Sequence, residues 1–191
     1  MYYLDFNDIP HSAYSIIYAD CPWAYGDKLT GHSFSLDRQY ATMGKEGLKN
    51  LRVADLCRDD ATLFMWVTNP QLPVGLEVMK SWGFKYKTVA FVWTKKTPLG
   101  NNVANLGRGT MGSVELCLLG TRGHPLRAMR NIHQLVSTVR GRHSAKPIEV
   151  RQRIEQLMGG SEDGKIELFA RGSCEGWDQW GDTPEVEVSP V

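Results

Sequence analysis

The feature that most constrains this chain is a short, apolar, β-prone run, residues 15–19, that ends in Asp20-Cys21-Pro22-Trp23. A run of this kind, followed by turn residues, is typical of a buried strand. Open α/β sheets bind their ligands at the carboxyl ends of such strands. We therefore expect the acid and the aromatic ring of this turn to lie at a binding site. The four residues alone leave one alternative open, an ordinary Asp-Pro turn with Trp23 in the core.

Further strand-like runs alternate with helical segments. The apolar patterns predict strands over residues 63–67, 86–94, 114–119, 135–139 and 166–170. One helix is predicted after Pro73, ending at Gly83, and another is predicted to open at Pro147 and end at Gly159-Gly160. Residues 24–44 and 95–113 are polar or rich in glycine, which predicts long loops. The alternation predicts an α/β fold with a mostly parallel sheet and helices on both faces.

Composition indicates one compact domain. The chain has 191 residues, of which 42% are hydrophobic and 23% are charged, which excludes disorder for most of it. We expect one domain over residues 1–182 and an acidic, loose tail over residues 183–191. The four cysteines are scattered without a CxxC pair, which predicts reduced thiols and no zinc site. With no membrane-length apolar run and no signal sequence, a cytoplasmic location is expected.

Charge is strongly segregated along the chain. Residues 80–153 carry 14 Lys or Arg but only two acids, Glu115 and Glu149, a local balance of +12. Residues 1–79 carry 6 bases and 10 acids, and residues 154–191 carry 2 bases and 9 acids. A basic middle between acidic ends predicts a positive face that binds phosphates, with ordinary solvated charge as the alternative. Arg127, Arg130 and Arg140 are the candidate phosphate contacts.

The turn at residues 20–23 has the chemistry to hold an aryl amine. One amine hydrogen could be donated to the Asp20 carboxylate and the other to the Cys21 carbonyl, while an aromatic base stacks on Trp23. This is a receptor for the 6-amino edge of an adenine taken out of its helix. A nucleophilic Cys21 thiol is the competing hypothesis, but it needs an activating base that the sequence does not place.

The turn resembles the Asp-Pro-Pro-Trp signature of the adenine-N6 methyltransferases, the family of the mRNA adenosine methyltransferase and its bacterial and phage DNA-modifying relatives. Five further segments follow in the family's order: Tyr40-Ala41-Thr42-Met43, Leu63-Phe64-Met65-Trp66-Val67-Thr68, Trp82-Gly83-Phe84 with Val92-Trp93, His143-Ser144-Ala145-Lys146-Pro147, and Glu167-Leu168-Phe169. The resemblance covers nearly the whole chain. It implies a Rossmann-like methyltransferase fold that uses S-adenosylmethionine, with permuted motif order and no metal.

The resemblance also implies roles for individual residues. Asp20, Cys21, Pro22 and Trp23 would form the catalytic turn, and Tyr40 would contact the substrate. Lys146 would contact the cofactor, and its place beside a helix N-terminus suits a carboxylate. The remaining cofactor contacts would be Phe169 and Arg171, beside the adenosine, with Asp182 and Thr183 in place of the family's ribose-binding Asn-Gln pair. Cys21 departs from the family's proline, which keeps the carbonyl but loses a fixed φ.

Three functions remain open at this stage. The first is a methyltransferase acting on the 6-amino group of adenine in DNA, the second is the same reaction on RNA, and the third is a non-catalytic subunit that binds nucleic acid. Retention of Asp20 and Trp23 favours an enzyme, and the small size of the chain favours a bacterial or phage DNA enzyme. A homodimer is expected as a possible source of extra contact surface. No membrane partner is expected.

Overall fold

The computed structural model describes residues 1–24, 42–105, 109–139, 145–159 and 164–181. Its strands are β1 (Tyr2–Tyr3), β2 (Tyr14–Ala19), β3 (Cys57–Val67), β4 (Lys85–Lys96), β5 (Val114–Arg122), β6 (Leu135–Val139), β7 (Gly164–Ala170) and β8 (Asp178–Gly181). Its α-helices are α1 (Lys45–Asn50), α2 (Val53–Leu56), α3 (Leu72–Ser81) and α4 (Ile148–Met158). Short 3-10 turns, η1 (Phe6–Asp8) and η3 (Asn69–Gln71), follow β1 and β3.

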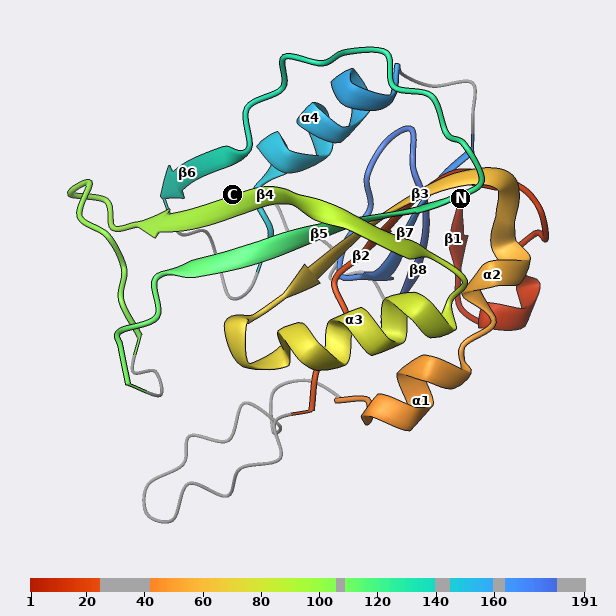
Figure 1. The fold of residues 1–191 in the computed structure, drawn as a ribbon, viewed down its shortest axis with the longest axis horizontal. Coiled ribbons are helices and arrows are strands. Elements are labelled where there is room, and N and C mark those ends of the chain that lie inside the picture. The colour runs from red at the N-terminus through yellow and green to blue at the C-terminus, as the bar shows by residue number, and fades with distance from the viewer. Residues whose placement is uncertain (25–41, 106–108, 140–144, 160–163, 182–191) are drawn as a thin grey trace, which may run out of the picture.

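All described strands form one sheet in the order β1-β8-β7-β2-β3-β5-β4-β6 (Figure 1). Every neighbouring pair is parallel except the two that involve β5, which runs antiparallel to both β3 and β4. The carboxyl ends of the other strands and the amino end of β5 therefore meet at one edge, which we call the carboxyl edge. Residues that follow β2, β4 and β7 lie there with the first residues of β5.

Helices cover both faces of the sheet, and Figure 1 shows α4 on the opposite side from α3 and α1. The central strands alternate their side chains between two separate cores, as the period of a strand requires. Ile17, Leu63 and Met65 pack in the core beneath α1, α2 and α3. Tyr18, Phe64 and Trp66 pack in the core beneath α4. Burial on both faces explains why these strands read as continuous apolar runs.

The predicted α/β class, parallel sheet and helices on both faces are confirmed. Each predicted strand is present, although β3 starts six residues earlier than the apolar pattern suggested. The described helices include none that is both long and apolar enough to cross a bilayer. The loop predicted over residues 95–113 is partly wrong, because β4 continues to Lys96 and bridges pair Lys96 with Asn102 and Asn105 with Gly112. Most of the other predicted loop, residues 25–41, lies outside the described residues.

Candidate active site

Three backbone hydrogen bonds hold the turn after β2. The Asp20 N–H donates to the carbonyl of Leu168 on β7 at 3.4 Å, so Asp20 lies beside the end of β7. The Trp23 N–H donates back to the Cys21 carbonyl at 2.9 Å, which closes a tight turn. The Pro22 carbonyl accepts from the Met43 N–H at 2.9 Å, and Trp23 forms a β-bridge with Met43. The turn is thus fixed at the carboxyl edge, between β7 and β3.

Trp23 anchors this turn in the core. Its side chain is 7% exposed, and its indole N–H donates to the Trp66 carbonyl at 3.0 Å. The ring packs in the core beneath α3, where a Cβ built on Gly75 would lie 3.8 Å from it. This packing agrees with the core interpretation of Trp23 that the sequence left open. The structure does not test stacking of a base on this ring, so the stacking role stays a prediction.

Cys21 lies in an environment that does not activate a nucleophile. The residue is 3% exposed, and burial raises the pKa of its thiol well above the usual value, an effect that the Asp20 carboxylate reinforces. A protonated, buried thiol is a poor nucleophile. The carbonyl of Cys21 is different, because a carbonyl oxygen has two lone pairs and the Trp23 N–H uses one of them.

Lys146 meets Asp20 directly. Its ammonium nitrogen lies 2.7 Å from Asp20 Oδ1, and both side chains are largely buried. Lys146 precedes Pro147, the N-cap residue of α4, and its ammonium also lies 5.5 Å from the ring centre of Trp66. The structure therefore brings the predicted catalytic acid and the predicted cofactor lysine into one ion pair, although 126 residues separate them in sequence.

Two residues that the sequence analysis missed extend this pair into a chain of alternating charge. Glu115, at the start of β5, lies 3.4 Å from the Lys146 ammonium and also pairs with Lys95, at the end of β4. Burial alone would raise the pKa of Glu115, but the attraction of Lys146 and Lys95 outweighs it and holds the pKa below the usual range. Burial alone would lower the pKa of Lys146, but Asp20 and Glu115 outweigh it and raise the pKa. Both groups are thus charged at neutral pH.

The segment after β7 supplies the other predicted cofactor residues. Phe169 has a left-handed backbone, with φ of 63°, where the pairing of β7 with β8 shifts register. Its ring packs edge-on against Trp180, with centroids 5.0 Å apart. Arg171 lies close enough to Lys146 for its charge to oppose that of the lysine. The roles of Phe169, Arg171 and Lys146 in cofactor binding stay predictions.

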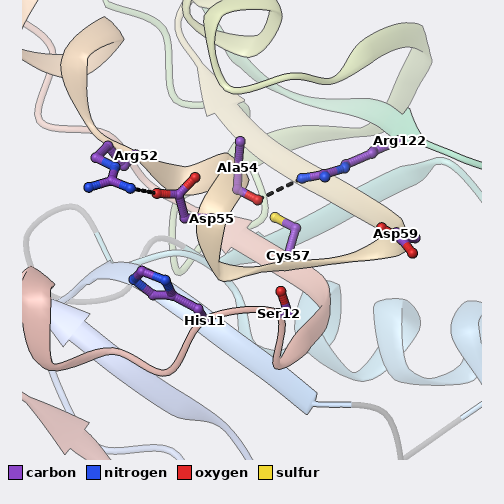
Figure 2. A pocket seen from close by; sticks show the side chains of 8 residues that line it. All are labelled: His11, Ser12, Arg52, Ala54, Asp55, Cys57, Asp59 and Arg122. Atoms are coloured by element: carbon purple, nitrogen blue, oxygen red, sulfur yellow. Dashed lines mark hydrogen bonds and ion pairs between the residues drawn. The ribbon is translucent and has the colours of Figure 1, made fainter.

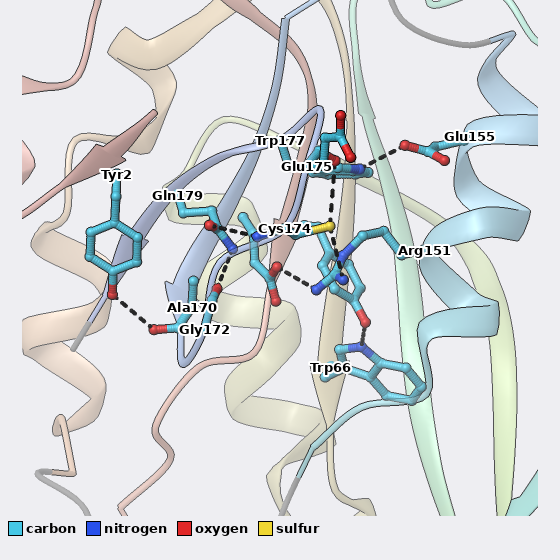
Figure 3. A network of polar contacts seen from close by, with 12 residues as sticks. Tyr2, Trp66, Arg151, Glu155, Ala170, Gly172, Cys174, Glu175, Trp177 and Gln179 are labelled. Carbon is cyan, nitrogen blue, oxygen red and sulfur yellow. Dashed lines mark hydrogen bonds and ion pairs between the residues drawn. The ribbon is translucent and has the colours of Figure 1, made fainter. Parts of the chain in front are cut away.

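A polar network braces the elements that carry Lys146 and Arg171 (Figure 3). Arg151 of α4 pairs with Glu167 of β7 at 2.6 Å and donates to Cys174 Sγ at 3.2 Å. The side chain of Gln179 accepts from the Cys174 N–H at 3.0 Å and donates to the Gly172 carbonyl at 2.5 Å. Buried networks of this kind fix the relative placement of their elements. Glu167, which the sequence noted only as a motif residue, therefore has a structural partner.

The other predicted residues are placed as follows. Tyr40, Arg140, Asp182 and Thr183 lie outside the described residues. Arg127 and Arg130 are exposed in the segment between β5 and β6. The N–H of the neighbouring Ala128 donates to the carbonyl of Leu157, in the last turn of α4. These two arginines therefore lie near the opposite end of α4 from Lys146, and they are not part of the site around Asp20.

A hollow of about 330 Å³ lies at the other edge of the sheet (Figure 2). It is lined by residues before β2, in α2 and at its N-cap, at the start of β3 and at the end of β5: His11, Ser12, Arg52, Ala54, Asp55, Cys57, Asp59 and Arg122. Arg52 pairs with Asp55, and Arg122 donates to the Ala54 carbonyl at 2.6 Å. Within the described residues, no group of three or more His, Cys, Asp or Glu side chains is arranged to hold a metal ion. The predicted catalytic acid Asp20 and the predicted cofactor lysine Lys146 meet at the carboxyl edge instead, so we place the candidate active site there.

Comparison with known proteins shows the family of this chain. The sequence model of the MT-A70 family matches residues 14–183. The chain belongs to the MT-A70 family. It is 37% identical over 194 residues to the type II methyltransferase M.MunI of Mycoplasma sp, covering 92% of this chain and 80% of that protein.

Two eukaryotic MT-A70 relatives are more distant and much longer. The chain is 30% identical over 161 residues to an MT-A70-like N(6)-adenosine-methyltransferase of Arabidopsis thaliana, covering 83% of this chain and 22% of that protein. It is 28% identical over 173 residues to the N(6)-adenosine-methyltransferase catalytic subunit METTL3 of Homo sapiens, covering 88% of this chain and 27% of that protein. The MT-A70 assignment confirms the family resemblance and the methyltransferase fold.

Proposed function

We propose that this MT-A70 protein transfers a methyl group from S-adenosylmethionine to the 6-amino group of adenine in DNA. The observation that carries the proposal is the Asp20 carboxylate at the end of the central strand β2, next to the Cys21 carbonyl and 2.7 Å from Lys146. A methyltransferase of this family needs an amine acceptor and a cofactor-binding cation at the same edge. Asp20 and Lys146 have that chemistry.

Two acceptors on one turn suit a primary aryl amine. The amine of adenine has two N–H groups and a lone pair that is delocalised into the ring, so it is a weak nucleophile. Hydrogen bonds to the Asp20 carboxylate and the Cys21 carbonyl would favour a pyramidal nitrogen whose lone pair points away from both acceptors. Positioning of this kind, with stabilisation of the developing positive charge by Asp20, supplies the acceleration.

The residues of the carboxyl edge fit S-adenosylmethionine, which supplies a methyl group on a sulfonium ion. Its carboxylate would be held by the Lys146 ammonium and by the first N–H groups of α4, where the N-cap Pro147 offers no side-chain acceptor. Arg171 and Phe169 would lie against the adenosine, and the network around Arg151 and Glu167 would keep α4 and β7 in place for this contact.

Similarity to M.MunI supports DNA as the substrate, because the chain spans four fifths of that bacterial type II methyltransferase. The second candidate is RNA, which is favoured by the similarity to METTL3, an N(6)-adenosine-methyltransferase subunit. The chain spans only about a quarter of METTL3, so the comparison gives less support. A cytoplasmic location and a homodimer remain proposals that accompany this function.

The deciding experiment measures methyl transfer from radiolabelled S-adenosylmethionine to three polymers of the same base sequence: single-stranded DNA, duplex DNA and single-stranded RNA. Nucleoside analysis by mass spectrometry identifies the modified base. We expect N6-methyladenine in one or both DNA forms. Label only in RNA would replace the first candidate with the second, and cofactor binding without transfer to any polymer would favour a non-catalytic subunit.

A further inference from the structure

The Lys146 ammonium lies between two carboxylates of different origin. Asp20 follows β2 and lies at 2.7 Å, whereas Glu115 begins β5 and lies at 3.4 Å. The second oxygen of Glu115 pairs with Lys95, so Glu115 is the anion between two cations. The side chains of these four residues are 12–17% exposed, which shields their interactions from solvent.

Each of the two cations, Lys146 and Lys95, lies over the ring of a tryptophan. The Lys146 ammonium lies 5.5 Å from the ring centre of Trp66, and the Lys95 ammonium lies 4.7 Å from that of Trp93. The two indoles pack edge to face with centroids 6.1 Å apart, and Glu115 is in register with Trp93 across the β4–β5 ladder. Cation–π contacts restrict where each ammonium can lie. The position of Lys146 is therefore defined by Trp66, by Asp20 and by Glu115.

The pairing with Asp20 has a consequence for the proposed reaction. Asp20, which would accept from the amine of adenine, already accepts from Lys146 at its Oδ1 atom. When the amine binds, the charge of Asp20 is shared between the amine and Lys146, and Lys146 needs another anion close by. Glu115 is that anion, and it is less than one ångström farther from the ammonium than Asp20 is.

We propose that Glu115 is a positioning residue for methyl transfer: it holds Lys146 at the carboxyl edge when Asp20 turns to the amine of adenine. This inference rests on the proposed function, which assigns Asp20 to the amine. Without Glu115, Asp20 would be the only protein carboxylate paired with Lys146 within the described residues, and the amine would have to compete with the lysine for it. Lys95 would then lose its anionic partner as well.

The test compares Glu115→Gln with Glu77→Gln as a matched control. Glu77 of α3 pairs with Lys45 of α1, and both side chains are exposed. Steady-state methylation of an adenine-containing oligonucleotide should show at least a tenfold lower kcat/KM for the oligonucleotide in Glu115→Gln. Glu77→Gln should stay within twofold of the wild type. Equal values for the two variants would overturn the inference.

A second measurement reports on Lys146 without any turnover. Competitive labelling of lysines with acetic anhydride, followed by peptide mass spectrometry, gives the pH at which the Lys146 amine becomes reactive. Loss of the Glu115 charge should move this midpoint to lower pH by at least half a unit, because one of two stabilising anions is removed. An unchanged midpoint would overturn the inference. Within the part of the chain that the structure describes, the charged and titratable groups that interact with Lys146 are Asp20 and Cys21 after β2, Glu115 and Cys117 of β5, and Arg171 after β7.

Glu115→Asp separates charge from packing. It keeps the carboxylate on a shorter arm, so its Lys146 midpoint and its kcat/KM should lie closer to the wild type than to Glu115→Gln. A loss equal to that of Glu115→Gln would contradict a role that depends on charge. The labelling experiment needs no nucleic acid and no turnover, so it can be done whether or not the protein transfers methyl groups. Absence of methyl transfer in the wild-type protein would therefore refute the proposed function but not the contact between Glu115 and Lys146. An unmoved midpoint would refute the role of Glu115 alone.

Discussion

At the scale of single residues, the turn at residues 20–23 combines one side chain that can accept hydrogen bonds, Asp20, with two buried residues, Cys21 and Trp23, that pack in the core. Asp20 faces Lys146 at the carboxyl edge, whereas Cys21 and Trp23 are almost fully buried in the core beneath α3. The structure leaves Cys21 two possible contributions, its carbonyl oxygen and its packing. A buried thiol with a raised pKa contributes nothing as a nucleophile at neutral pH.

Substitution of Cys21 tests this division. Cys21→Pro and Cys21→Ala both keep the carbonyl, so each should retain methyl transfer within about tenfold of the wild type, roughly 1.4 kcal/mol in the barrier. Cys21→Ala should also lose about 1 kcal/mol of stability in urea unfolding, because it leaves a small cavity in the core. Loss of more than about a hundredfold in both variants, near 2.7 kcal/mol, would show that the acceptor account of the turn is wrong.

Thiol reactivity gives an independent check at the same scale. Cys21, Cys57 and Cys117 are buried, and burial raises the pKa of each thiol, so the thiolate fraction at pH 7–8 is lower than in an exposed cysteine. Cys174 is partly exposed. Iodoacetamide should therefore modify Cys174 first in the native protein, and Cys174→Ser should remove the fast phase. Rapid modification of Cys21 in the native state would contradict the burial of this thiol.

At the scale of elements, the fit between α3 and the turn depends on Gly75. A Cβ built on this residue would lie 2.5 Å from Val67 Cγ1 and 3.8 Å from the Trp23 ring. Glycine inside a helix costs about 1 kcal/mol relative to alanine, so the close approach of α3 to β3 explains its presence. The helix thereby reaches the end of β3 and covers the indole that anchors the turn.

Gly75→Ala should destabilise the protein in spite of its better helix propensity. The clash with Val67 should cost about 1–3 kcal/mol and outweigh a gain of about 1 kcal/mol in propensity. Gly47→Ala in α1 is the matched control, because a Cβ there meets only the flexible side chain of Met43 at 3.0 Å and beyond. Thermal unfolding should show a lower Tm for Gly75→Ala alone. A Tm for Gly75→Ala equal to or above that of Gly47→Ala would refute the close-packing argument.

Elements with a clear periodicity were predictable from sequence, and the short ones were not. The apolar run before Asp20 and the helix between Pro147 and Gly159 fall where the pattern placed them. The pattern does not detect β8, because a four-residue Asp-Gln-Trp-Gly strand is defined by its backbone pairing with β7 rather than by alternation. Nor does it detect α1 and α2, which have six and four residues.

The same limit applies to the candidate site. Asp20 was predicted from its place at the end of a strand, and Lys146 through the family resemblance, but their direct contact depends on how β2 and α4 meet across the sheet. Glu115 was noted only as one of two acids in a basic stretch. That rarity was a usable signal, since both of these acids turn out to be partners of neighbouring cations. An acid that interrupts a long basic segment is worth testing for a role in a site.

At the scale of the whole molecule, the described cations of the basic middle are spread over several elements and are not all gathered at the carboxyl edge. Lys95 and Lys146 lie beside Asp20, whereas Arg127 and Arg130 are exposed near the far end of α4. If nucleic acid binds along this side of the molecule, these arginines would contact phosphates distant from the target adenine. The positive face itself stays a prediction.

Oligonucleotide binding should therefore weaken steeply with salt, with a log–log slope of magnitude above about 2, because each neutralised phosphate releases a counterion. Exchange of Arg127 and Arg130 for Gln should reduce that magnitude by about 1–2 and leave cofactor affinity unchanged. Lys49→Gln with Arg52→Gln is the control, because it removes two cations that already pair with Glu46 and Asp55. A wild-type slope near zero, or an equal change in both double variants, would refute a positive face at Arg127 and Arg130.

The most direct test of the account is the effect of Asp20→Asn on methyl transfer and cofactor binding together. The amide keeps the shape of the side chain but loses the charge and presents a donor as well as an acceptor to the amine. We expect N6-methyladenine formation in the target oligonucleotide to fall by more than a hundredfold, about 2.7 kcal/mol, while calorimetric cofactor affinity stays within the same order of magnitude. Turnover of Asp20→Asn within tenfold of the wild type, about 1.4 kcal/mol, would contradict Asp20 as the amine acceptor.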